Sequence, residues 1–313
     1  MGELVSHNYT EYLQYKDRVH VFYIGFDLLD NGLGQASTKF EDELFNDIPA
    51  FAFGTDVCRE KLNQEGPIPT VREAMQKIYA IPEIQEAQKE YLNSTTTEDK
   101  YLKRGEFGEL MLYHFLHEYF NADALISKIY FKDSAGLPPH GFDAVHVDLD
   151  NQVIWLGESK LYKSGKHAID ELVKDVVGYP DSTGRIHKGH FSTDFFKSEF
   201  QIITNRVHDS KFVYPDFIQK LINPNTKVLD KLANINVALF AGFDSTVIKS
   251  SDTEELESKL ALEIDSLATK AQKGLEIHPW NNQLHVYLFL FPLADKREFV
   301  SMLHQKLKGA QQI

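Results

Sequence analysis

Residues 141–160 decide the fold of this chain, and they read GFDAVHVDLDNQVIWLGESK. Mostly apolar stretches stand on both sides of Asp150-Asn151, a pair that is typical of a tight turn. The pattern predicts antiparallel strands over 142–149 and 152–160. A two-residue turn, or a four-residue loop centred on the same point, would place Asp143 directly opposite Glu158, whereas a three-residue loop would not.

The end of this hairpin that is remote from the turn carries three charged side chains. Side chains alternate along a strand, so Asp143, Glu158 and Lys160 should share one face. Two opposed carboxylates repel each other and require a cation. Mg²⁺ (or Mn²⁺) suits oxygen ligands and activates water for phosphodiester hydrolysis, while Lys160 would orient that water or stabilise charge. The alternative is a simple salt bridge between Lys160 and either carboxylate.

The flanking sequence predicts an α/β protein in which helices cover a mixed sheet. Helices are expected at 39–46, 69–80, 83–92, 102–120, 166–178, 193–205, 214–222, 252–272 and 296–307, and further strands at 19–27, 124–131, 235–242 and 284–292. The polar run 93–100 lacks apolar periodicity. It predicts a boundary between an N-terminal α/β segment, 1–95, and a second domain, 96–313.

Composition excludes several classes of protein. Apolar residues make up 42% of the 313 residues, which is enough for a core and excludes a disordered chain. A single cysteine, Cys58, excludes an internal disulfide and a multi-cysteine metal site. The most apolar stretch, 284–294, is too short to cross a membrane, so we expect a cytoplasmic protein. A net charge of −13 argues against a protein that coats nucleic acid.

Asp143 followed by Glu158-Ser159-Lys160, between helices, resembles the PD-(D/E)xK pattern of restriction-endonuclease-like nucleases. More narrowly, RGEFGEL at 104–110, GFDAVH at 141–146 and WLGESKLYKSG at 155–165 resemble the HamA family, to which AbpA is related. HamA is the nuclease of the Hachiman anti-phage defence system. The close match covers about residues 100–180, and the resemblance implies a nuclease core over about 100–245 with N-terminal and C-terminal elaborations.

The resemblance also implies a role for individual residues and a partner. Asp143 and Glu158 would be metal ligands and Lys160 the catalytic lysine; Glu109, or else Glu106, would complete the site from the preceding helix. Phe142 stands where the fuller motif has proline. The implied function is a DNA endonuclease effector restrained and delivered by a superfamily-2 helicase of the same operon (HamB-like). A non-catalytic regulatory subunit and an RNA-processing nuclease remain the alternatives.

Residues after the site bear on nucleic-acid binding. Over 160–190 six basic residues stand against four acidic ones, unlike the acidic segment 1–95. Lys163 and Lys166 are candidate phosphate contacts, with ordinary surface lysines as the alternative. The run 187–190, HKGH, is either a phosphate contact or a polar loop. The distribution suggests a nuclease with weak DNA affinity of its own, and our hypothesis is that residues 1–95 bind the partner.

Overall fold

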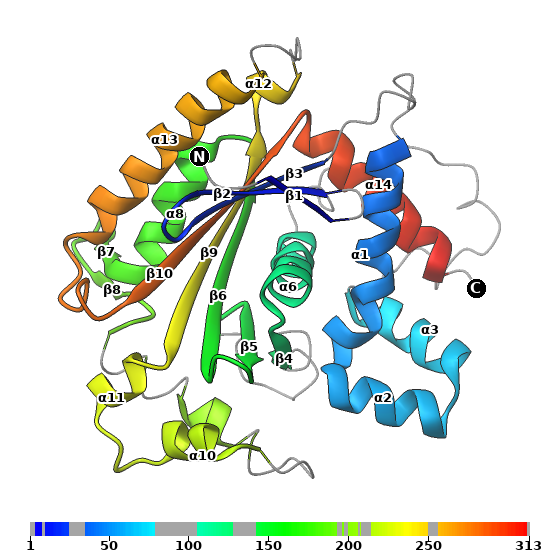
Figure 1. The fold of residues 1–313 in the computed structure, drawn as a ribbon, viewed down its shortest axis with the longest axis horizontal. Coiled ribbons are helices and arrows are strands. Elements are labelled where there is room, and N and C mark those ends of the chain that lie inside the picture. Colours follow the sequence, from blue (N-terminus) through cyan, green and yellow to red (C-terminus); the bar gives the residue numbers. More distant parts are fainter. Residues whose placement is uncertain are drawn as a thin grey trace.

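A computed structural model describes residues 4–7, 10–24, 35–78, 105–127, 142–192, 196, 200–205, 207, 214–249 and 256–311. Eight strands form one mixed sheet, and helices cover both of its faces (Figure 1). The predicted α/β class, with a mixed sheet flanked by helices, is confirmed.

The sheet has four parallel strands at its centre and an antiparallel hairpin at each side. The strands, in sheet order, are β1 (Leu4–His7), β2 (Thr10–Lys16), β3 (Val19–Ile24), β10 (His285–Leu293), β9 (Ile235–Asp244), β6 (Val153–Tyr162), β5 (Ala144–Asp148) and β4 (Asp123–Ser127). Strands β3, β10, β9 and β6 pair in parallel. Every residue of β9 except its last is buried, as expected of a parallel strand covered on both faces.

Two helical layers cover the sheet (Figure 1). One core lies beneath α1 (Gln35–Phe53), α2 (Thr55–Gln64), α3 (Pro67–Ile78), α6 (Glu106–Phe120) and α14 (Lys296–Gln311). The other lies beneath α8 (Gly165–Val177), α10 (Asp216–Ile222), α11 (Val228–Leu232), α12 (Thr246–Lys249) and α13 (Leu256–Leu275). A separate two-stranded sheet, β7 (Gly178–Pro180) and β8 (Ile186–Lys188), follows α8 directly. None of the helices in the described residues has the length and apolar character needed to cross a bilayer.

Helix α6 is buried on all sides along residues 106–116, because it lies between the sheet and α1. Its close approach to β6 depends on Gly157: a Cβ there would lie 2.7 Å from Cδ2 of Leu112. The ring of Phe115 stacks on Phe22 of β3 at a centroid distance of 4.1 Å. Helix α6 therefore joins the N-terminal strands to the hairpin that carries the charged residues.

Most of the predicted elements are present with shifted ends. The helix predicted at 83–92 and the boundary predicted at 93–100 lie outside the described residues, as does much of the helix predicted at 193–205. The sequence did not predict strands β1 and β2 or helix α2. The polar residues of 10–16 and the charged residues of 55–64 obscure the buried positions of β2 and α2. Strand β3 pairs with β10, so the sheet continues across the predicted boundary. Partner binding by residues 1–95 stays a prediction.

Candidate active site

The β5–β6 hairpin has the predicted register. Ala144 pairs with Gly157, and Asp148 pairs with Val153. The strands are joined by the four-residue loop 149–152, the longer of the two loops compatible with this register. Asp148 closes the loop by accepting hydrogen bonds from N of Asn151 at 2.9 Å and from its Nδ2 at 2.8 Å.

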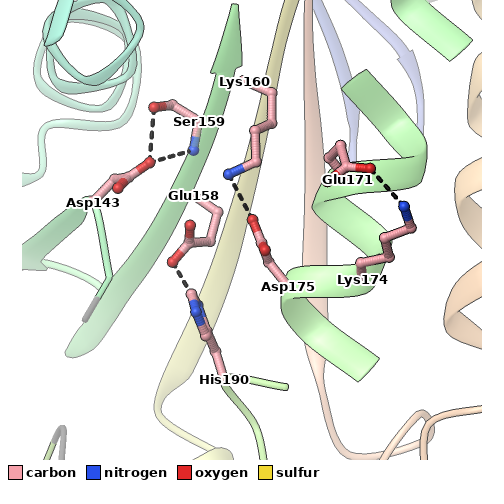
Figure 2. A network of polar contacts seen from close by, with 8 residues as sticks. All are labelled: Asp143, Glu158, Ser159, Lys160, Glu171, Lys174, Asp175 and His190. Atoms are coloured by element: carbon pink, nitrogen blue, oxygen red, sulfur yellow. Dashed lines mark hydrogen bonds and ion pairs between the residues drawn. The ribbon is translucent and has the colours of Figure 1, made fainter. Parts of the chain in front are cut away.

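Asp143 lies in a bend immediately before β5, one residue beyond the last paired position. Its Oδ2 accepts hydrogen bonds from both N and Oγ of Ser159, each 2.9 Å long (Figure 2). The Asp143 side chain is therefore fastened to β6 next to Glu158. The sequence argument missed Ser159, because the middle residue of an E-x-K triplet was treated as a spacer.

Glu158 is buried, with only 2% of its surface exposed. Burial, followed by the nearby charge of Asp143, raises the pKa of Glu158 to about 7. Nδ1 of His190 lies 2.6 Å from Oε1 of Glu158. Burial alone would lower the pKa of His190, but the carboxylates of Glu158, Asp175 and Asp143 together outweigh it and the pKa is raised. The sequence left His190 open between a phosphate contact and a polar loop; the structure places it against a site carboxylate.

Lys160 points along the same side of β6 and reaches the end of α8 (Figure 2). Its Nζ lies 2.6 Å from Oδ2 of Asp175. Burial alone would lower the pKa of Lys160, but the charges of Glu158 and Asp175 raise it above its ordinary value. The lysine is therefore a cation in a cluster of carboxylates. Asp175 was not predicted from sequence, since nothing local distinguishes it from other helix-surface acids.

The two faces of the hairpin pack in different cores. The apolar strip beneath the charged residues, made up of Val145, Val147, Ile154 and Leu156, packs in the α8 core. Trp155 packs in the opposite core, beneath α6. His146 is also buried on that face, and its Nδ1 donates to O of Ala122 at 2.8 Å.

The two glutamates proposed from the preceding helix lie in the first turn of α6. Glu106 and Glu109 are both buried, at 5% and 6% exposure. Gly108, between them, packs against Ser159: a Cβ on this glycine would lie 3.4 Å from Oγ. Within the described residues, no three His, Cys, Asp or Glu side chains are placed to hold one metal ion. A metal-binding role for Glu109 or Glu106 therefore stays a prediction.

The acids of residues 160–190 already have basic partners. Each lies within ion-pair distance of a lysine or histidine, as the pairs Asp170–Lys270, Glu171–Lys174, Asp175–Lys160 and Asp181–His187 show. Lys163 and Lys166 are exposed at the start of α8, and no acid within the described ranges pairs with either. Their ammonium groups are available to an anionic partner.

The donor set fits Mg²⁺ or Mn²⁺. These ions take one or two carboxylates and complete their shell with waters and phosphate oxygens. Asp143 and Glu158 provide two buried carboxylates close enough for one charge to raise the pKa of the other. Each carboxylate is oriented through one of its oxygens, by Ser159 in one case and by His190 in the other.

Comparison with known proteins gives one family. The HamA family model matches residues 2–307, nearly the whole chain. No curated protein and no solved structure matches.

Proposed function

We propose, on the premise that this chain belongs to the HamA family and is a component of the Hachiman anti-phage defence system, that it is a metal-dependent deoxyribonuclease. In this proposal it is the effector of a two-component system. A superfamily-2 helicase of the same operon restrains it and delivers it to DNA in the cytoplasm. The fold, the charged cluster and the charge distribution each support one part of the proposal.

The observation that carries the catalytic part is the arrangement of Asp143, Glu158 and Lys160. The register of β5 and β6 brings the first two together, and the alternation along β6 places Lys160 beside Glu158. Two carboxylates that raise each other's energy in a buried position are costly unless a cation compensates them. A protein that only binds a partner has no use for two adjacent buried carboxylates. A metal-dependent phosphodiesterase requires them to hold its metal ion.

Each residue then has a distinct task. Asp143, fixed by Ser159, and Glu158, fixed by His190, would hold Mg²⁺. When bound, the ion lowers the pKa of a coordinated water and neutralises charge on the phosphate. Lys160 would leave Asp175 to donate to the attacking water or to a phosphate oxygen. Glu109 would orient the water or the metal from α6, with Glu106 as the second candidate.

DNA would reach the site with assistance. Lys163 and Lys166 offer two cations to the phosphate backbone, whereas the chain as a whole carries −13. Two contacts of this kind give weak binding, because each neutralised phosphate adds only a small increment of affinity. A helicase that already holds DNA would supply the missing affinity, which fits an effector that must stay inactive until it is recruited.

The test incubates the full-length chain, with and without its operon partner, on plasmid and linear DNA and on RNA, with Mg²⁺ or Mn²⁺. We expect DNA cleavage that is abolished by Glu158→Ala with Lys160→Ala. The matched control is Glu171→Ala with Lys174→Ala, which removes the same two charges from a pair on α8 that points away from Asp143 and Glu158 (Figure 2). Cleavage that survives the first double variant contradicts the site. Cleavage of RNA alone favours the RNA-processing alternative, and absence of cleavage with the partner present favours the regulatory subunit.

A further inference from the structure

We propose that His190 is a positioning residue of this site, which holds the Glu158 carboxylate in the orientation that binds the metal ion. The inference rests on the proposed function and deepens it. The contact that carries it joins Nδ1 of His190 to Oε1 of Glu158 at 2.6 Å, between side chains that are 19% and 3% exposed. In Figure 2 the other oxygen of Glu158 is directed away from His190, toward the side of Asp143 and Lys160.

His190 is itself held from two directions. Its backbone N donates to O of Asp175 at the end of α8, at 2.7 Å. Its ring lies edge-on to Phe142, the neighbour of Asp143, at a centroid distance of 5.5 Å. The next residue, Phe191, is 1% exposed and anchors the chain in the α8 core. His190 therefore joins the segment before β5, strand β6 and α8.

The backbone that presents His190 is built for close approach. Gly178 and Gly189 lie at the open end of the β7–β8 hairpin, next to α8. A Cβ on Gly189 would lie 2.1 Å from O of Val176. Any side chain at this position would push the strand away from α8. Gly178 has φ +82°, a conformation that glycine adopts without strain. The two glycines therefore set how closely the β7–β8 hairpin approaches α8, and with it the position of His190 relative to Glu158.

A carboxylate needs this support because rotation about its last bond is soft. Without His190, the buried Glu158 could turn its second oxygen away from Asp143. Side chains that orient a metal ligand in this way typically contribute about 10–100-fold to metal affinity. The same range is expected here, in metal binding as well as in cleavage.

The experiment measures Mn²⁺ affinity of the full-length chain from the electron paramagnetic resonance signal of free Mn²⁺, without DNA. His190→Ala should weaken binding about 10–100-fold. His190→Asn, whose amide nitrogen occupies the place of Nδ1, should bind within about threefold of the natural protein, and His190→Gln, with its nitrogen one bond farther out, should bind less well than the asparagine variant. The control is His187→Ala, which removes a hairpin histidine paired with Asp181, and it should bind normally.

The outcomes separate the two proposals. Unchanged or tighter Mn²⁺ binding by His190→Ala, or no difference between the asparagine and glutamine variants, overturns the role of His190 while leaving the nuclease intact. Mn²⁺ binding that depends on His190, in a protein that cuts no nucleic acid, supports the positioning role and removes the catalytic function. Absence of Mn²⁺ binding by the natural chain overturns the metal site and with it the role of His190. If His190→Ala fails to fold, the asparagine–glutamine comparison decides.

Discussion

Ser159 donates two hydrogen bonds to a single oxygen of Asp143, one from its backbone N and one from its Oγ, each 2.9 Å long. Asp143 precedes the first paired residue of β5, so the ladder itself does not fix its side chain. The two bonds supply that fixation. They also tie the first carboxylate of the site to the residue between Glu158 and Lys160, so all three charged groups are attached to β6.

Replacing Ser159 with alanine should therefore impair catalysis while the fold is retained. The backbone bond survives and the hydroxyl bond is lost, so we expect a decrease in cleavage rate of about tenfold. Ser164→Ala is the control, because it removes a hydroxyl that accepts from N of His167 at the start of α8. It should lower the free energy of unfolding by about 1 kcal/mol and leave the cleavage rate unchanged. Equal cleavage rates for both variants would contradict the role of Ser159.

The pair formed by Lys160 and Asp175 should show strong energetic coupling. Its side chains are 20% and 25% exposed. A double-mutant cycle with alanine at each position, measured by urea unfolding, should give about 1–3 kcal/mol of coupling. The Glu171–Lys174 pair has the same 2.6 Å separation but is more exposed at 28% and 42%. Its coupling should be clearly smaller, because water screens it. A coupling near zero between Lys160 and Asp175 would show that Asp175 does not hold the lysine, and equal coupling in the two pairs would contradict the effect of burial.

Acid should destabilise the protein partly through His146. Burial lowers the pKa of His146 to about 4, whereas an unfolded histidine titrates near about 6.5. Between these values the unfolded chain binds more protons, so stability is complete above about pH 6.5 and falls as the pH falls toward 4. The loss should be on the order of 2–3 kcal/mol at pH 4.

His146→Asn keeps a donor for O of Ala122 and removes the titration. In chemical unfolding at several pH values, this variant should therefore lose less stability between pH 7 and pH 4 than the natural protein. His167→Asn makes the same substitution at an exposed histidine and serves as the comparison. An unchanged profile in the His146 variant would contradict the assignment.

Gly157→Ala should damage the packing that brings α6 to the site. The added methyl group would lie 2.7 Å from Cδ2 of Leu112 and 3.1 Å from Cβ of Ala144. Overpacking of this kind costs about 1–3 kcal/mol. Gly309→Ala, at a helical glycine with nothing within 4 Å, should instead stabilise the protein slightly. The melting temperatures of the two variants test this prediction. A Gly157→Ala variant as stable as the natural protein would contradict the close approach of α6 to β6.

The choice between Glu109 and Glu106 can be made by exchanging each for glutamine. Both side chains are buried in the first turn of α6, so neither substitution alters an exposed surface. If Glu109 completes the site, Glu109→Gln should lower the cleavage rate at least tenfold and weaken Mn²⁺ binding, while Glu106→Gln changes both by less than about threefold. The reverse result would assign the role to Glu106.

Much of the site followed from local sequence. The register of the β5–β6 hairpin depends on the position of the turn, which is visible in residues 141–160 at Asp150-Asn151. Asp143, Glu158 and Lys160 could be predicted together because neighbouring strands of a hairpin bring close residues into contact. The α/β class followed for the same reason, from the periodicity of each segment.

The sequence by itself thus determined the hairpin, its charged end and the family of the chain. Only the tertiary structure decided which side chains orient that end. Ser159 acts because Asp143 leaves the ladder and turns toward it, while Asp175 and His190 act because α8 folds back over the sheet. Such contacts depend on how α8 and the end of the β7–β8 hairpin pack against β6. No residue pattern within a single segment encodes that packing. The periodicity of a segment determines which face of a helix or strand a residue occupies, whereas the packing of the elements determines which residues it contacts.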